Sequence, residues 1–307
     1  MKKAEVKYVL MLLAVVSVWG LDPLVNRYFY GYFSAAALSA LSTLASAILF
    51  VALAVRHREK WDRRYLTVAL PIALVNSLAC VLQRIGLQYT SPTRYAFLEH
   101  LSCLSVPLAL LLFFRKRPST AQWAAALLCL LGCGFLAGAD ILHGSIGIGD
   151  LLCAAAGLML GVGIVTTARC TEGMDIRLFT AVHSVTYFLT SAVLCLSLHC
   201  IRVGGAPIEE IVLTPKPLPI LAAVLFGLLS VGLCWLLRNE ATRHLSPSLV
   251  AVITPLAALI TAAISILRGL DTPTPAFFAA CLFFLSAAIL AGLGEKKGTA
   301  HTEKSPW

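Results

Sequence analysis

Charged residues are scarce in this chain of 307 residues. They make up 13% of it, against about 25% in a typical soluble domain. So few charges cannot cover a water-exposed surface of this size, whereas 59% of the residues are hydrophobic and the mean hydropathy is +0.86. The composition excludes a soluble globular domain and predicts an integral membrane protein whose solvent is the lipid bilayer.

Motifs for metal binding, redox chemistry and catalysis are also missing. The ten cysteines include no CxxC pair and lie almost entirely in or beside apolar segments, where cysteine acts as a small hydrophobic residue. No phosphate-binding loop of the form GxxxxGK[ST] occurs, and neither HExxH nor GxSxG is present. We therefore expect no disulfide framework, no metal, no cofactor, no direct use of ATP and no enzymatic activity.

The net charge of +9 does not indicate nucleic-acid binding, because the basic residues form short clusters between apolar segments. With the N-terminus in the cytoplasm, eighteen Lys and Arg residues fall in or near cytoplasmic segments and six fall on the outer side. This count includes Arg238 among the cytoplasmic residues. Such a bias follows the positive-inside rule and predicts a multi-pass protein of the cell (inner) membrane with both termini in the cytoplasm.

Ten segments are long and apolar enough to cross a bilayer as helices, so an all-α integral membrane fold is predicted. The first segment lacks a cleavage site of small residues and is expected to be a retained span rather than a signal peptide. The predicted spans are 8–28, 33–55, 65–89, 93–114, 119–139, 150–170, 176–201, 217–238, 246–268 and 273–293.

Ten spans divide into two halves of five, and an odd number of spans per half makes the halves inverted repeats. Pro107 in the fourth span and Pro255 in the ninth occupy corresponding places, as do Leu136-Ala137-Gly138 and Leu290-Ala291-Gly292 in the fifth and tenth. The predicted organisation is a first repeat at 1–145, a second repeat at 146–294 and a disordered cytoplasmic tail at 295–307.

Short motifs along almost the whole chain, from about 8 to 293, occur in a characteristic order. They are Trp19-Gly20, Leu87-Gln88-Tyr89-Thr90-Ser91-Pro92 leading into Ala96-Phe97-Leu98, Pro107, Gly149-Asp150-Leu151-Leu152, and Pro255. In this pattern the chain resembles the EamA-type transporters of the drug/metabolite transporter superfamily.

The resemblance implies ten helices, a central cavity lined mainly by spans 1, 3, 4, 6, 8 and 9, and transport, often export, of small metabolites or drugs. The chain departs from the pattern at Thr254, where many members have Glu, and after spans 4 and 9, where many have an acidic residue.

Asp22, Arg84 and Glu99 are ionisable residues inside predicted spans, where such residues are costly and indicate function. At about 1.5 Å per residue, Asp22 lies roughly 21 Å from the cytoplasmic entry, Arg84 about 8 Å and Glu99 about 9 Å from the outer end of their spans. We hypothesise an Asp22–Arg84–Glu99 network at the extracellular end of the cavity. It would bind a charged substrate group, form the outer gate, or carry a coupling proton on Glu99.

Each of these residues has a simpler explanation as well. Asp22 and Arg84 can lie at the membrane interface, with the Arg84 side chain extended to water. This explanation fits Glu99 less well, since Leu98, Leu101 and Cys103 surround it in the sequence.

The third span also carries Asn76, Cys80 and Gln83 on one helical face, beside Arg84. This polar face points either at the cavity or at a neighbouring helix, to which it would hydrogen-bond. The second half carries almost no buried charge by this count, so the first half is expected to hold most of the substrate chemistry. The glycines of the sixth span, Gly157, Gly161 and Gly163, are expected to serve close helix packing.

Aromatic residues and histidines complete the candidate site. Trp19 and Trp235 are candidates for stacking on a substrate, and His100 for a proton relay or a packing role. His183 is expected to be a packing residue. The predicted substrate-binding or coupling residues are Trp19, Asp22, Asn76, Gln83, Arg84, Glu99, His100 and Trp235.

These features together predict a secondary transporter of a small metabolite or drug-like solute. It would work by alternating access, with possible coupling to protons. Its partners would be the substrate and the lipid bilayer, without nucleic acid, and the chain would be a monomer or a homodimer. Alternatives are a passive facilitator without ion coupling and a membrane receptor or scaffold without flux.

Overall fold

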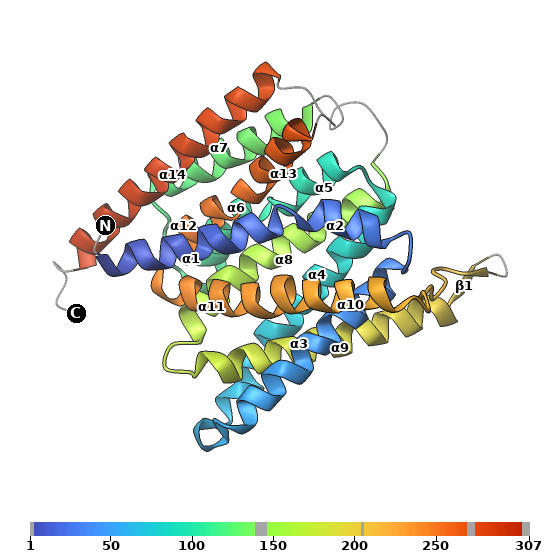
Figure 1. The fold of residues 1–307 in the computed structure, drawn as a ribbon. Helices are drawn as coiled ribbons and strands as arrows, with labels where there is room; N and C mark the ends of the chain where they lie inside the picture. Colours follow the sequence, from blue (N-terminus) through green and yellow to red (C-terminus); the bar gives the residue numbers. More distant parts are fainter. Residues whose placement is uncertain (1–2, 139–145, 204–205, 269–273, 303–307) are drawn as a thin grey trace.

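The computed structural model describes residues 3–138, 146–203, 206–268 and 274–302 (Figure 1). Nearly all of this part is helical. Its β-structure is a short antiparallel pair, β1 (Arg202–Val203) and β2 (Ala206–Pro207), together with one isolated bridge between Phe33 and Leu213. The fold is therefore an all-α membrane fold, as its composition predicts.

The helices follow the predicted spans closely, several spans being built from two or three consecutive elements. In the first half, span 1 is α1 (Lys3–Trp19) and α2 (Asp22–Phe29), span 2 is α3 (Ala35–Val55), span 3 is the π-helical η2 (Tyr65–Ala69) and α4 (Leu70–Tyr89), span 4 is α5 (Pro92–Glu99) and α6 (Ser102–Phe114), and span 5 is α7 (Thr120–Ala137).

In the second half, span 6 is α8 (Ile148–Cys170) and span 7 is α9 (Ile176–Cys200). Span 8 is α10 (Pro217–Gly227), the π-helical η4 (Leu228–Leu233) and α11 (Cys234–His244), span 9 is α12 (Pro247–Ile253) and α13 (Leu256–Leu267), and span 10 is α14 (Pro275–Thr302).

Within the described residues, nine spans are long and apolar enough to cross a bilayer, and Pro275–Ala291 is a shorter apolar helix. Three boundaries differ from prediction by five residues or more. Span 1 begins at Lys3 rather than at 8. Span 8 continues to His244 rather than ending at 238, and α14 continues to Thr302, past the predicted start of the tail at 295. Residues 303–307 of that tail lie outside the described part.

Three spans are interrupted near the middle of the molecule. Span 1 breaks at Gly20-Leu21, span 4 at His100-Leu101 and span 9 at Thr254-Pro255. Pro255 has no backbone N–H, so the helix cannot continue its hydrogen-bond pattern there. Pro107, in contrast, lies inside the continuous helix α6. The two corresponding prolines therefore have different local effects.

Close helix packing explains the glycines of α8, as expected. A Cβ atom on Gly157 would overlap the carbonyl oxygen of Leu98, at the break of span 4, and one on Gly161 would overlap the Ser105 hydroxyl. A Cβ on Gly163 would overlap the side-chain amide of Asn76. The lack of side chains thus lets α8 lie directly against spans 3 and 4.

Four of the closely packed helix pairs follow a simple rule. Helix α3 packs on α9, α7 on α14, α4 on α8, and α1 on α11. In span numbers these pairs are 2 with 7, 5 with 10, 3 with 6, and 8 with 1. When each span is replaced by its counterpart in the other half (1 by 6, 2 by 7, and so on), the same four pairs result, as expected for two repeats. The start of α1 and the end of α14 lie at the same end of the molecule (Figure 1).

Candidate functional site

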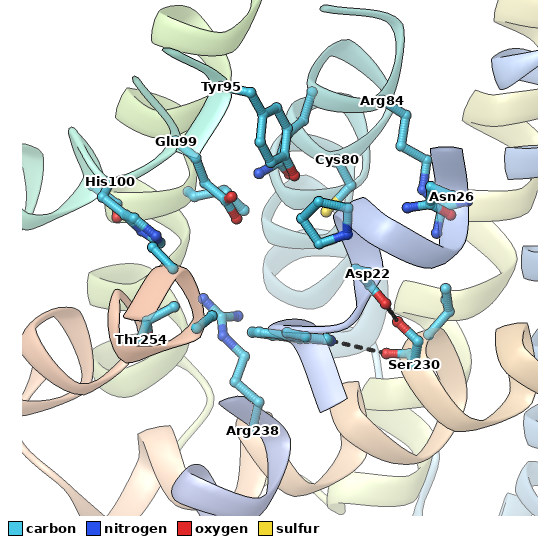
Figure 2. Close-up of a pocket in the computed structure, with 18 of the residues that line it drawn as sticks. Asp22, Asn26, Cys80, Arg84, Tyr95, Glu99, His100, Ser230, Arg238 and Thr254 are labelled. Atoms are coloured by element: carbon cyan, nitrogen blue, oxygen red, sulfur yellow. Dashed lines mark hydrogen bonds between the residues drawn. The ribbon is translucent and has the colours of Figure 1, made fainter. Parts of the chain in front are cut away.

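A cavity of about 110 Å³, measured at the centres of water-sized molecules, lies between the interrupted spans. Spans 1, 3, 4, 6, 8 and 9 line it, and span 7 contributes Tyr187. A water molecule needs only about 10–15 Å³ by this measure, so the space is sufficient for a small solute. Charged side chains reach this space from spans 1, 3, 4 and 8 (Figure 2).

The break in span 1 places two predicted residues on the cavity wall. Asp22, the first residue of α2, accepts a hydrogen bond from the Ser230 hydroxyl, which lies 2.8 and 2.9 Å from the two carboxylate oxygens. Trp19 donates its indole N–H to the Ser230 carbonyl at 3.1 Å. Between them, the Gly20 carbonyl accepts a hydrogen bond from Thr261. The break therefore ties span 1 to spans 8 and 9.

Arg84 lies in α4 with only 8% of its surface exposed, and it turns toward span 2. Its guanidinium donates to the hydroxyls of Ser42 at 2.9 Å and Ser39 at 3.4 Å. No ion pair in the described part of the chain joins Asp22, Arg84 and Glu99. The hypothesis of direct pairing is therefore wrong for this conformation, because Arg84 hydrogen-bonds to serines of span 2 and Asp22 to a serine of span 8. The three side chains nevertheless line one cavity (Figure 2).

Glu99 is the last residue of α5, directly before the break in span 4. Its carboxylate lies near the side chains of Gln83 and Tyr95 and faces the cavity (Figure 2). The adjacent His100 is 2% exposed, and its Nδ1 has no hydrogen-bond partner among the described residues. The break thus presents an acid and an imidazole side by side.

The predicted polar face of span 3 divides in two. Cys80, Gln83 and Arg84 line the cavity, whereas Asn76 does not. Asn76 is fully buried against Gly163 of α8. Seven of the eight predicted site residues therefore surround the cavity, and Asn76 is a packing residue between spans 3 and 6.

Arg238 is the main residue that the sequence analysis missed. It was assigned to a cytoplasmic segment because the apolar stretch of span 8 ends there, but α11 continues for six more residues and Arg238 is only 2% exposed. Its guanidinium carbon lies 4.7 Å from the centre of the Trp235 ring. Trp235 in turn stacks on His183, with ring centres 4.1 Å apart. His183 is thus a packing residue, as expected, but one that supports the cavity wall.

Several other residues that line the cavity could not be recognised from the sequence. Asn26, Tyr95, Tyr187, Ser230 and Thr261 are polar side chains common in membrane helices. Only the position of Ser230 inside the π-helical segment η4 marks it as unusual, and this feature is not visible in the sequence.

One conspicuous motif lies outside the cavity. Asp150, at the start of α8, forms an ion pair with Arg94 at 2.9 Å and accepts hydrogen bonds from Thr90 and from the backbone N–H of Gly147. A Cβ atom on Gly149 would overlap the backbone of Tyr89. The Gln88–Pro92 and Gly149–Leu152 motifs therefore pack and hydrogen-bond against each other and join the two halves.

Comparison with known proteins supports the same classification. Residues 6–138 match the EamA-like transporter family, which confirms the resemblance carried by the motifs and indicates a membrane transporter of the drug/metabolite type. A solved structure described as "Crystal structure of protein" has a TM-score of 0.72 and 19% sequence identity, covering 97% of this chain and 99% of that one. At this identity the similarity concerns the fold alone. No curated protein matches the sequence.

Proposed function

We propose that this chain, with its EamA-like first half, is a secondary transporter that moves a small metabolite or drug-like solute through the central cavity. The observation that carries the proposal is the cavity itself, in which Asp22, Arg84, Glu99 and Arg238 lie among apolar spans. Ionisable groups inside a membrane are costly and are retained for substrates, ions or gating.

Alternating access is supported by the interrupted spans. Discontinuous helices near the middle of a membrane are typical of transporter binding sites, where the breaks allow one bundle to move against the other. Spans 1, 4 and 9 all break beside the cavity. The self-matching helix pairs also support the proposed division into inverted repeats at 1–145 and 146–294.

Proton coupling would reside on Glu99. Its carboxylate faces the cavity without an ion-pair partner among the described residues, at the break in span 4. Binding and release of a proton there would change the charge of the cavity and the polarity of the break together. The protein would act in the cell membrane, with both termini in the cytoplasm, as a monomer or a homodimer.

Flux in proteoliposomes tests this proposal. A metabolite panel is first screened for stabilisation of the purified protein, and uptake of each stabilising compound is then measured with and without a pH gradient. Accumulation against a concentration gradient supports secondary transport. Equilibration without accumulation indicates the passive facilitator, and stabilisation without flux indicates a receptor.

A further inference from the structure

Arg238 is a buried cation without a matching anion. It lines the cavity from α11 with 2% of its surface exposed, and its Nε and Nη1 have no hydrogen-bond partner among the described residues. No ion pair in the described part of the chain includes it. An unpaired buried charge is strongly unfavourable, so such a group is normally matched by an anion.

Neither Asp22 nor Glu99 forms an ion pair with Arg238 in the described part of the chain. Asp22 accepts the hydrogen bond of Ser230, and Glu99 lies near Gln83 and Tyr95. Figure 2 shows the side chain of Arg238 entering from the side opposite Tyr95 and Arg84. The positive charge of Arg238 is thus available to something that enters the cavity.

The guanidinium group of Arg238 packs against an aromatic ring of the cavity wall. The group lies 4.7 Å from the Trp235 ring centre, and that ring is held by His183 at 4.1 Å. A guanidinium held in place offers its N–H groups as a planar fork that matches a carboxylate. The adjoining wall is apolar and includes Trp19, Leu160 and Ile164.

We propose that Arg238 is the anion-binding subsite of the cavity, and that the transported solute is an amphipathic organic anion with one carboxylate. The carboxylate pairs with Arg238, and the apolar body lies against Trp19 and Trp235. The solute carries one negative charge in this proposal, because one unpaired arginine needs one negative charge to balance it. This inference rests on the proposed transport function and specifies its substrate class.

Matched acids and amides test the subsite by binding alone. Thermal stabilisation of the purified, detergent-solubilised protein is titrated with phenylacetate and phenylacetamide, and with hexanoate and hexanamide. Each acid should reach half-saturation at a concentration about tenfold or more below that of its amide, because only the acid forms a charge-assisted pair. Arg238→Gln should remove this preference. Arg243→Gln, five residues further along α11 and bonded to the Met174 carbonyl outside the cavity, should preserve it.

Three results would overturn the proposal. They are equal half-saturation by acids and amides, an unchanged acid preference in Arg238→Gln, and stabilisation by sulfate alone as strong as that by phenylacetate. If Arg238→Gln does not fold, the comparison of acids with amides in the unaltered protein still decides. Acid-selective binding without any flux of these acids would contradict transport while leaving the anion subsite supported.

Discussion

The two halves of the molecule share one arrangement of helices but line the cavity with different chemistry. Spans 1–5 contribute Asp22, Arg84 and Glu99, whereas the described lining of spans 6–10 contains a single charged residue, Arg238, beside Trp235. The first half thus carries two acids, together with an arginine that is hydrogen-bonded to serines of span 2. The second half carries a cation and an aromatic surface suited to an organic anion.

Spans 4 and 9 show how closely the halves correspond and where they differ. Pro255 lacks an N–H, which leaves the carbonyl of Ala251 without its usual partner, and the Cys103 thiol of span 4 donates to that carbonyl at 2.9 Å. Cys103 and Ala251 are separated by 148 residues, the same separation as Pro107 and Pro255. Cys103 and Ala251, which occupy corresponding positions in the two halves, therefore contact each other. Only span 9 breaks at its proline.

Replacing Glu99 with Gln should change transport more than any other substitution proposed here, because it removes the proposed coupling group of the first half. Losing a charged hydrogen-bonding group costs about 1.5–3 kcal/mol, or about a 10- to 100-fold lower transport rate. The residual transport should no longer respond to pH, as measured by flux in proteoliposomes. Glu59→Gln, in the exposed 3-10 helix Arg58–Lys60, is the matched control. Unchanged flux at every pH would remove Glu99 from the mechanism.

Replacing Gly157 with Ala should destabilise the contact between the halves. The added methyl group would overlap the carbonyl oxygens of Leu98 and Glu99, and overpacking of this kind costs about 2 kcal/mol. A lower midpoint of thermal unfolding in detergent would report it. In the control Gly134→Ala the new methyl group would lie 3.7 Å from the Phe97 ring and should have little effect. Equal midpoints for the two variants would contradict the packing assigned to α8.

Replacing Ser230 with Ala should loosen the tie between spans 1 and 8. Asp22 would lose the hydrogen bond that this hydroxyl shares between its two carboxylate oxygens, at a cost of about 1.5 kcal/mol. Ser17→Ala is a suitable control, because the exposed Ser17 hydroxyl bonds only within its own helix to Leu13. If both variants unfold at the same temperature, the contact of Asp22 with Ser230 contributes no stability.

Replacing Asp175 with Asn should have the smallest effect. Partial burial raises the pKa of Asp175, but hydrogen bonds from Lys60 and from the backbone N–H of Arg177 outweigh it and hold that pKa below its ordinary value. The resulting stabilisation, about 0.5 kcal/mol, is present above about pH 4 and is lost as the pH falls through the lowered pKa. Unfolding midpoints at pH 7 and pH 3 would show this, with Glu172→Gln as control. A difference between Asp175→Asn and the unaltered protein that is as large at pH 3 as at pH 7 would contradict it.

Hydropathy was sufficient to predict the spans, because a membrane helix must be apolar along its whole length. It also located Asp22, Arg84 and Glu99, since each interrupts an apolar stretch. It could not locate Arg238, whose position at the end of an apolar stretch looks the same whether the residue faces water or a cavity. Pairing was equally hidden, because the serines that engage Arg84 lie more than forty positions away, in span 2.

The stack of His183, Trp235 and Arg238 has an optical consequence. The indole of Trp235 contacts both an imidazole and a guanidinium, so its emission should depend on the charge of its immediate surroundings. A solute whose carboxylate neutralises Arg238 would change that emission without any added label. If the proposed subsite exists, the emission of Trp235 would therefore report whether the cavity is occupied.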